Sequence, residues 1–307
     1  MIRTASQVHI VIEDVNDNAP EFGSAKVRIS VPESVEPGVP LYSALALDRD
    51  SGRNGQVSYR LVSGGLFGVE PRSGHLTLAS RLDYETAQRH SLVISATDAG
   101  EPPLSANLTV LLEVQDVNDN APVFERTEYS VPVSESLPVN SQVVQVTAVD
   151  LDTGNNARLT YRLLGEPREF GMFPNSGWVY LRSSLDRESR DRYSLKVAAT
   201  DNGSPPATAT ALLTVTVTDA NDNDPVFGRD SYQFTVEENL NRGATVGTVL
   251  ATDADLDNNA AIRYALIPAN SSFLINPVTG KSRKTIFFGT PYARPDRPAS
   301  GHVRFRS

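Results

Sequence analysis

Acidic residues recur along this chain in short motifs whose spacing suits a hard metal ion. The run D-V-N-D-N-A-P begins at Asp14 and again at Asp116, and D-A-N-D-N-D-P begins at Asp219. The steps, 116 − 14 and 219 − 116, are 102 and 103 residues. Carboxylate, amide and carbonyl oxygens are the ligands that Ca²⁺ takes, about six to eight at a time. The spacing therefore predicts one group of calcium ligands for each repeat of the chain.

Four further acidic motifs keep the same step. They are the glutamate of VPES, VSES and VEEN, the two aspartates of D-x-D, the acidic pair of LDYE and LDRE, and the aspartate of ATD. In chain order these acids are Glu33, Asp48, Asp50, Asp83, Glu85, Asp98, Glu135, Asp150, Asp152, Asp186, Glu188, Asp201, Glu238, Asp253 and Asp255. Five kinds of motif in one register indicate a tandem array of a single unit.

The composition narrows the chemistry. The net charge of −9 argues against a nucleic-acid backbone as the partner. The sequence has no Cys, which excludes disulfides, thiolate zinc sites and cysteine nucleophiles. Its four His match no zinc-ligand spacing, and magnesium needs a tighter octahedron and keeps its waters. Calcium remains as the ion that fits the clustered acids.

The elements that must position these acids are short strands. Alternation of apolar and polar residues predicts strands at residues 27–31, 129–133 and 232–236, at 57–61, 159–163 and 262–266, and at 108–114 and 212–217. Turn signals such as SGRNG, EPP and GSPP separate them. About seven short strands in about 100 residues is typical of an immunoglobulin-like sandwich. The predicted fold class is therefore all-β, in tandem Greek-key sandwiches joined by acidic linkers.

The motifs also set the predicted boundaries. We expect residues 1–20 to be the last strand and exit linker of a repeat that begins upstream. Residues 21–122 and 123–225 are predicted to be complete repeats, and residues 226–280 an incomplete third repeat of low order. Residues 281–307 are basic and rich in Pro, and we expect a disordered tail. A basic surface for nucleic acid or membrane is the less favoured alternative for this tail.

On a sandwich, the acids of one repeat, its exit linker and the loops of the next repeat would converge. Eight carboxylates would meet between the two complete repeats: Glu33, Asp83, Glu85, Asp116, Asp119, Asp150, Asp152 and Asp201. So many like charges repel one another strongly unless cations neutralise them. Calcium would then turn a flexible linker into a stiff one.

The motifs P-E-S, D-x-D-x-G-x-N-G, L-D-x-E, A-T-D and D-x-N-D-N-x-P resemble those of cadherin extracellular repeats, over about residues 1–280. Within that family the sequence is most similar to the very long Dachsous and Fat type. The resemblance implies three Ca²⁺ at each junction between repeats. It implies that the first ion between the complete repeats uses Glu33, Asp83, Glu85 and Asp119. It implies that the second shares Glu33, Glu85 and Asp119 and adds Asp116, Asp152 and the Val117 carbonyl. It implies that the third uses Asn118, Asp150, Asp152, Asp201 and the carbonyls of Asn120 and Asn156.

The same resemblance assigns ligands to two less complete junctions. The one that precedes the first complete repeat offers Asp14, Asn16, Asp17, Asn18, Asp48, Asp50, Asn54 and Asp98, and we expect it to hold the third ion best. The one that follows the second complete repeat offers Glu135, Asp186, Glu188, Asp219, Ala220, Asn221, Asp222, Asn223, Asp253, Asp255 and Asn259. This last junction has no ATD acid, and Asp257 replaces the usual Gly after D-x-D. Both features weaken the prediction of its third ion.

The resemblance implies calcium-dependent cell–cell adhesion, on the extracellular side of the plasma membrane, through heterophilic pairing with another cadherin such as a Fat-type one, in planar cell polarity. Sequons at Asn107, Asn202 and Asn270 fit an extracellular glycoprotein. The chain shows no signal peptide or membrane span, so we expect anchoring through a segment outside it. A truncated soluble isoform or fragment that acts as a decoy, or has no adhesive activity, is an alternative.

A calcium-stabilised glycosidase that uses a pair such as Asp83 and Glu85 is less favoured, because catalytic pairs do not repeat in every domain. The sequence is therefore expected not to be an enzyme. The single Trp178 lies mid-repeat and is expected to be a core or partly exposed strand residue rather than an adhesive one.

Overall fold

The computed structural model of the chain describes residues 7–63, 65–267 and 272–284. Every regular element among these residues is a β-strand, and none of them lies in a helix. In this described part there is accordingly no helix long and apolar enough to cross a membrane. The predicted all-β class is confirmed.

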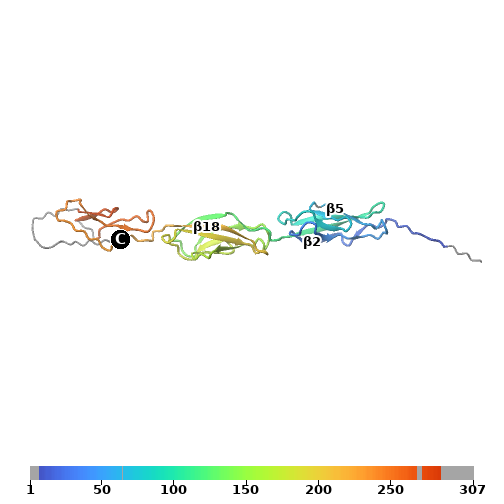
Figure 1. The fold of residues 1–307 in the computed structure, drawn as a ribbon, viewed down its shortest axis with the longest axis horizontal. Coiled ribbons are helices and arrows are strands. Elements are labelled where there is room, and N and C mark those ends of the chain that lie inside the picture. Colours follow the sequence, from blue (N-terminus) through green and yellow to red (C-terminus); the bar gives the residue numbers. More distant parts are fainter. Residues whose placement is uncertain (1–6, 64, 268–271, 285–307) are drawn as a thin grey trace, which may run out of the picture. The chain divides into compact units, whose positions relative to one another are not determined.

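The first repeat is a sandwich of two main sheets (Figure 1). Its nine strands are β1 (Glu21–Phe22), β2 (Lys26–Pro32), β3 (Pro40–Ser43), β4 (Ala46–Leu47), β5 (Ser58–Ser63), β6 (Phe67–Val69), β7 (His75–Leu78), β8 (Arg89–Thr97) and β9 (Ser105–Gln115). One sheet has the order β2-β9-β8-β5 and the other β3-β7-β6, while β1 pairs with β4 alone. Strands β2 and β9 run parallel, although they stand at opposite ends of the repeat's sequence.

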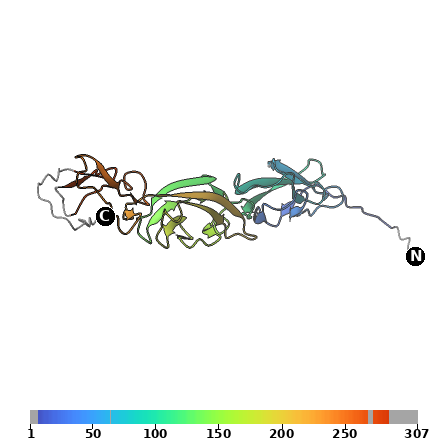
Figure 2. The ribbon, with the colours of Figure 1, turned by 60° about the vertical axis from the view of Figure 1, so that its left-hand side comes forward.

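The second repeat has the same topology (Figure 2). Its nine strands are β10 (Val123–Phe124), β11 (Glu128–Ser134), β12 (Gln142–Gln145), β13 (Ala148–Val149), β14 (Thr160–Leu164), β15 (Phe170–Met172), β16 (Trp178–Leu181), β17 (Arg192–Thr200) and β18 (Thr208–Thr218). The sheets are β11-β18-β17-β14 and β12-β16-β15, with β10 paired to β13. Trp178 is partly exposed on β16, as the sequence predicts.

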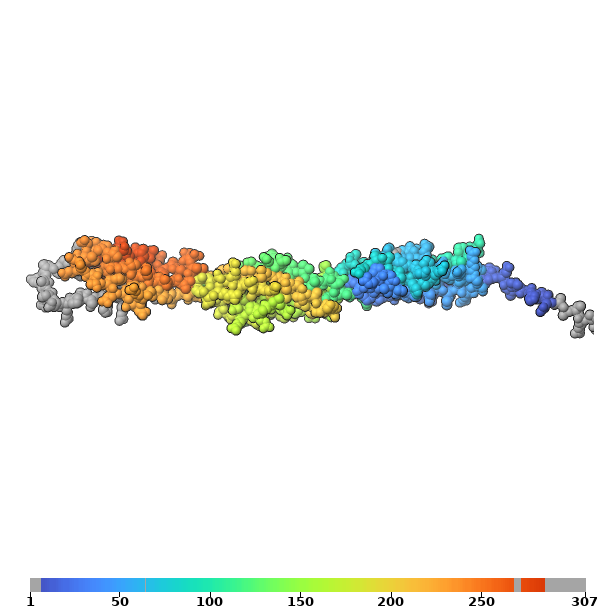
Figure 3. All heavy atoms as spheres, in the orientation of Figure 1, coloured from blue at the N-terminus to red at the C-terminus, as the bar shows by residue number. Residues whose placement is uncertain are grey.

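The alternation of the long strands explains the sandwich. Along β9, Leu108, Val110 and Leu112 are at most 1% exposed, and the residues between them face outward. Leu213 and Val215 of β18 are fully buried at matching positions. Each buried aliphatic side chain contributes about 1.5–3 kcal/mol by removing apolar surface from water. Figure 3 shows the outer atoms of the first repeat, coloured blue to cyan, that cover this core on one face.

The third repeat has only part of this architecture in the described residues. Its strands are β19 (Val226–Phe227), β20 (Thr245–Thr248), β21 (Ala251–Thr252), β22 (Phe273–Ile275) and β23 (Lys281–Lys284). They form the sheet β20-β23-β22 and the pair β19-β21. This arrangement matches the three-stranded sheet and the short pair of the complete repeats.

The predicted strands at 232–236 and 262–266 are wrong, because the structure assigns no strand to either segment. Their counterparts in the first repeat are β2 and β5, which pair with β9 and β8. The described residues of the third repeat contain no counterpart of β8 or β9. An alternating segment becomes a strand only where another strand accepts its backbone hydrogen bonds.

One predicted boundary and one expected strand also differ from the structure. Strand β23 runs to Lys284, past the boundary placed at residue 280, because it pairs with β20 and β22. Residues 285–307 of the predicted tail lie outside the described residues. Residues 7–13, expected to hold a final strand, form no strand, and no described residue pairs with them.

The contacts of the chain divide it into two compact units. One holds the first repeat together with residues 148–160 and 199–209, and the other holds residues 126–147, 161–198 and the third repeat. The linker between the complete repeats therefore belongs to the same unit as the loops of the second repeat that follow it.

Candidate functional site

Three linkers carry the acidic clusters, and we name each junction by its linker. The leading junction has the linker 14–20, the middle junction 116–122 and the last junction 219–225. The leading and middle junctions lie within the first compact unit, and the last junction lies within the second.

In the middle junction, Glu33 binds the linker and the acidic loop of its own repeat. It follows β2 directly and is 5% exposed. Its Oε1 accepts a hydrogen bond of 2.9 Å from the Val117 amide, and its Oε2 accepts one of 2.6 Å from the Tyr84 amide. Charge-assisted hydrogen bonds from backbone N–H groups hold this carboxylate in one position.

Carboxylates of both repeats and of the linker meet at this junction. One oxygen each of Glu33, Glu85 and Asp116 lie within 4.8 Å of one another. A second such group, also within 4.8 Å, joins Glu85 with Asp119 and Asp152. Glu85 therefore takes part in both groups, as a shared ligand of two neighbouring ions would.

The linker is also tied to the loops of the second repeat. Asn118 Nδ2 donates to Asp201 Oδ1 over 3.2 Å and to the Pro205 carbonyl over 2.7 Å. Asn120 Nδ2 donates to Asp152 Oδ1 over 2.7 Å. Asp201 is 1% exposed, so its carboxylate is shielded from water.

The remaining predicted ligands of the middle junction lie around these contacts. Asp116 Oδ2 accepts bonds from the Thr153 amide over 3.1 Å and from Asn156 Nδ2 over 2.8 Å. Asp150 Oδ1 accepts a bond from the Asp152 amide over 3.0 Å. Asp83 is bonded to Thr86 and belongs to neither group of three.

Some buried oxygens at the junctions have no hydrogen-bond partner. In the described part of the chain, five side-chain atoms are buried in this state: Asn16 Oδ1, Asp48 Oδ2, Asp116 Oδ1, Asn118 Oδ1 and Asp150 Oδ2. All five belong to residues that the sequence predicts as calcium ligands. A buried unsatisfied oxygen costs about 1–3 kcal/mol, so native proteins rarely keep one without a role. The donor set is all oxygen, which fits Ca²⁺.

The charges of the middle junction oppose one another. Burial, together with the charges of Glu33, Asp119 and Asp152, raises the pKa of Glu85. Burial and the neighbouring Asp152 and Asp116 raise the pKa of Asp119, and burial with Asp152 and Asp201 raises the pKa of Asp150. Burial and mutual repulsion therefore disfavour the charged form of these carboxylates. Cations bound among them would relieve the repulsion.

The leading junction has the same contacts between the linker and the repeat that follows it as the middle junction has. Asn16 Nδ2 donates to both oxygens of Asp98 over 3.3 Å and to the Pro102 carbonyl over 2.7 Å. Asn54 Nδ2 donates to Asp14 Oδ2 over 3.0 Å. The other four predicted ligands, Asp17, Asn18, Asp48 and Asp50, are joined by hydrogen bonds that centre on Asn18 and Asp50.

The last junction repeats the glutamate contacts. Glu135 accepts bonds from the Ala220 amide over 2.7 Å and from the Arg187 amide over 2.6 Å. Two groups of carboxylates lie within 4.8 Å here as well: Glu135 with Asp186 and Glu188, and Glu188 with Asp219 and Asp255.

The linker of the last junction is bonded to the third repeat in part. Asn223 Nδ2 donates to Asp222 over 2.9 Å and to Asp255 over 2.7 Å. Asp253 Oδ1 accepts a bond of 3.0 Å from the Asp255 amide. Asn221 is exposed, whereas its counterpart Asn118 is partly buried.

The loop of the last junction keeps its shape without its glycine. Asp257 has φ 49°, close to the φ 59° of its counterpart Gly154. Asn259 Nδ2 still donates to Asp219 Oδ2, over 2.9 Å. An aspartate tolerates the left-handed region better than most residues, though less well than glycine.

The last junction also contains a residue that the sequence analysis did not single out. Arg187 Nε donates to Asp219 Oδ1 over 2.6 Å, and its Nη2 donates to Glu188 and to the Ala254 carbonyl. Burial would lower the pKa of Arg187, but its bonds and charges from Asp219 and Glu188 raise it. Burial alone would raise the pKa of Asp219, but hydrogen bonds from Leu256, Asn259 and Arg187 hold it low. The signal was present in the sequence, since LDRE has an arginine where LDYE has Tyr84.

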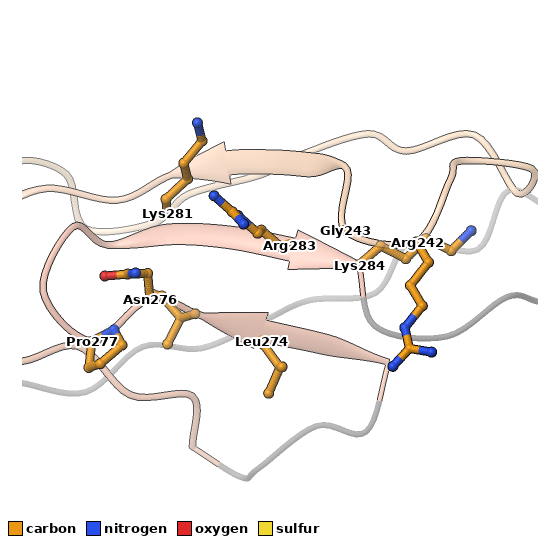
Figure 4. Close-up of a pocket in the computed structure, with 9 residues that line it drawn as sticks. Arg242, Gly243, Leu274, Asn276, Pro277, Lys281, Arg283 and Lys284 are labelled. Carbon is orange, nitrogen blue, oxygen red and sulfur yellow. The ribbon is translucent and has the colours of Figure 1, made fainter.

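A pocket on the third repeat is basic rather than acidic. It is lined by Arg242, Leu274 and Asn276, and by Lys281, Arg283 and Lys284 of β23 (Figure 4). Lys281 and Arg283 alternate along β23 with the buried Ser282 and Lys284. None of the predicted calcium ligands lines this pocket.

Comparison with known proteins identifies the same domain three times along the chain. The family model described as the cadherin domain matches residues 27–115, 129–218 and 232–297. Protein dachsous of Drosophila melanogaster is 59% identical over 90% of this chain, and the match spans 8% of that protein. Cadherin EGF LAG seven-pass G-type receptor 2 of Homo sapiens is 42% identical over 87% of the chain and 9% of that protein. The chain thus spans less than a tenth of these curated relatives.

Solved structures show the same architecture. The crystal structure of mouse Cadherin-23 EC22-24 is 33% identical, has a TM-score of 0.79, and is covered to 89% by 88% of this chain. The human CDH23 EC21-23 structure is 30% identical, with a TM-score of 0.75, 88% of this chain and 91% of that chain being covered. The chain therefore belongs to the cadherin family, as its acidic motifs predict.

Proposed function

We propose that this chain is part of an extracellular adhesion ectodomain whose repeats are stiffened by calcium at their junctions. The proposal rests on the buried oxygens without partners and on the groups of three carboxylates within 4.8 Å. The unpartnered oxygens of Asn16 and Asp48 recur one repeat later in Asn118 and Asp150. Groups of three carboxylates lie at both the middle and the last junctions. A solvated acidic surface would not bury oxygens of the linker without partners.

The residues of the middle junction would hold the ions in two sets. Glu33, Asp83, Glu85, Asp116, Asp119, Asp152 and the Val117 carbonyl form the set nearer the first repeat. Asn118, Asn120, Asp150, Asp152, Asn156 and Asp201 form the set nearer the second repeat. Bound calcium would neutralise the acids and link both repeats to the linker.

The protein itself prepares these ligands. The Val117 and Tyr84 amides orient Glu33, and Asn156 Nδ2 and the Thr153 amide bind one oxygen of Asp116 and leave the other free. Preorganised ligands lose less freedom on binding, so the site binds an ion more tightly than a flexible acidic loop would.

The free energy that bound calcium adds to folding is appreciable at extracellular calcium concentrations. Extracellular calcium modules bind with Kd of about 10⁻⁴–10⁻³ M. At a free concentration of about ten times Kd, one site adds about 1.4 kcal/mol to the free energy of unfolding. A few such sites are comparable with the ~5–15 kcal/mol that holds a typical domain folded.

Calcium titration of the full chain tests this function. We expect uptake of calcium at the middle junction, larger dimensions in solution scattering because stiff linkers keep the repeats from folding back on one another, and slower proteolysis near Asp116 and Asp219. Glu85→Gln should weaken uptake at the middle junction, because Glu85 belongs to both carboxylate groups there. Glu21→Gln is the matched control on an exposed acid outside the clusters. Unchanged scattering and proteolysis between calcium and chelator would refute the proposal.

For the adhesive role, we propose heterophilic binding to another cadherin, such as a Fat-type one, on an adjacent cell in planar cell polarity. The similarity to Protein dachsous and to human Protocadherin Fat 1, which is 40% identical over 91% of this chain, supports this choice. Beads coated with the chain should aggregate with beads coated with Fat-type repeats in calcium and separate in chelator. If soluble chain instead blocks aggregation between the full-length cadherins, the decoy alternative is favoured. Neither role involves catalysis.

A further inference from the structure

The middle and last junctions differ at one position of the same loop. Tyr84 of LDYE and Arg187 of LDRE stand 103 residues apart, like Glu85 and Glu188. Their backbones are alike, because each amide donates to Oε2 of the buried glutamate over 2.6 Å. The difference therefore lies in the side chains.

The side chain of Arg187 connects three parts of the last junction. Its Nε donates to the linker residue Asp219 over 2.6 Å. Its Nη2 donates to Glu188 of the second repeat and, over 2.8 Å, to the carbonyl of Ala254, which lies in the loop of the third repeat. The side chain is 11% exposed, so little water screens these contacts. A single cation thus bonds to both repeats and the linker.

The middle junction has no such cation. Asp116 Oδ1, the counterpart of Asp219 Oδ1, is buried without a hydrogen-bond partner. Tyr84 packs instead against the hydrophobic core of the first repeat. In the last junction Arg187 therefore donates to this carboxylate oxygen, whereas in the middle junction the oxygen has no partner.

We propose that Arg187 is a built-in counter-cation that holds the last junction together when calcium is scarce and competes with calcium for Glu188 and Asp219. This inference rests on the proposed function, since it assumes that calcium binds these acids. The same carboxylate oxygens cannot hold a guanidinium and coordinate an ion, so calcium must displace the side chain. The last junction then needs more calcium than the middle one and loses less order without it.

Exchanging the two side chains tests the proposal in the full chain. The variants are Arg187→Tyr, its reciprocal Tyr84→Arg, and Arg187→Gln, which removes the charge and keeps a long polar side chain. Mass spectrometry of proteolysis products in graded calcium and in chelator reports each linker separately by its cleavage position. In chelator, we expect the wild-type linker at Asp219 to be cleaved several-fold more slowly than the linker at Asp116. Arg187→Tyr and Arg187→Gln should remove that difference, and Tyr84→Arg should protect the linker at Asp116.

Loss of Arg187 should weaken the last junction in chelator but make it easier for calcium to protect that junction. Loss of Arg187 should lower the calcium concentration that protects the last junction by roughly tenfold, as expected when a charge-assisted hydrogen bond no longer competes. The proposal is overturned if both Arg187 variants leave the chelator cleavage and the calcium midpoint of the last junction unchanged. That result would leave the proposed function standing if calcium still protects both linkers. Absence of calcium protection in the wild-type chain would instead refute the proposed function, and the cleavage in chelator would still test Arg187.

Discussion

Asn118 Nδ2 lies 3.2 Å from Asp201 Oδ1, and this contact ties the linker to the second repeat. The same pair occurs 102–103 residues earlier as Asn16 and Asp98. In both, the amide oxygen of the asparagine is buried without a partner. The nitrogen is used within the protein, so the oxygen is the atom left to bind a cation.

Gly203→Ala should disturb this asparagine without removing a ligand. A Cβ at Gly203 would overlap the side-chain amide of Asn118, so the amide must leave its position against Asp201. We expect loss of about one bound calcium per chain, measured by titration calorimetry. Gly23→Ala is the control, because nothing lies within 4 Å of a Cβ at Gly23. Equal stoichiometry in both variants would show that Asn118 is not a ligand.

Chelation should lower the thermal stability of the complete repeats. Without an ion, burial and the charges of Glu33, Asp119 and Asp152 disfavour the charged form of Glu85 and raise its pKa. We expect calorimetry to show a higher unfolding midpoint in calcium than in chelator, by several degrees for about 1.4 kcal/mol per site. Magnesium at the same concentration should restore little of the difference. A midpoint that does not depend on the divalent ion would contradict the prediction.

Asp257→Gly should stabilise the loop of the last junction. Its φ of 49° lies in the left-handed region, which glycine adopts without the Cβ strain that an aspartate carries. We expect a gain of about 0.5–1 kcal/mol in the stability of the loop, measured by amide exchange at Leu256 and Asn259. Gly154→Ala, at the matching position with open space around the Cβ, should lose a similar amount through φ alone. A destabilising effect of Asp257→Gly would show that the aspartate side chain itself has a role.

Lys284→Leu should stabilise the third repeat. Lys284 is 2% exposed at the position where the other repeats have the buried Leu78 and Leu181, and its Nζ reaches the Glu238 carbonyl over 2.7 Å. Leucine would bury apolar surface without desolvating an ammonium, for a gain of about 1–3 kcal/mol.

The readout is amide-exchange protection of β20 and β22, which both pair with β23. We expect low protection across 230–280 in the wild-type chain and higher protection in the variant. Arg283→Thr, on the outward-facing position of β23, should change little. If Arg283→Thr and Lys284→Leu act alike, net charge rather than burial is the cause.

The repeat and most of its strands could be predicted because one signal recurred. Alternation located β2, β5 and β9, and the common step of the acids predicted which loops would meet. The same alternation failed at 232–236 and 262–266, since it reports which face of a segment is apolar and not whether a partner strand is present.

The contacts of single side chains needed coordinates. No spacing in the sequence indicates that Asn156 would use its side-chain nitrogen on Asp116, or that Arg187 would reach a carbonyl in the following repeat. Both depend on the path of a loop in space. Motif spacing therefore predicts which residues gather, and the structure adds which atoms of those residues are already bonded.

The constant step of the linker contacts has a consequence for changes in the gene. Asp14, Asp116 and Asp219 each bond to the asparagine 40 residues further along the chain. In-phase excision of residues 21–122 would place Asn156 40 residues after Asp14, the same spacing that it now has from Asp116. An array of this kind can therefore gain or lose whole repeats while each remaining linker keeps its spacing to the loop that it binds. A deletion that is not a whole repeat would change that spacing, and the linker aspartate would no longer reach its asparagine.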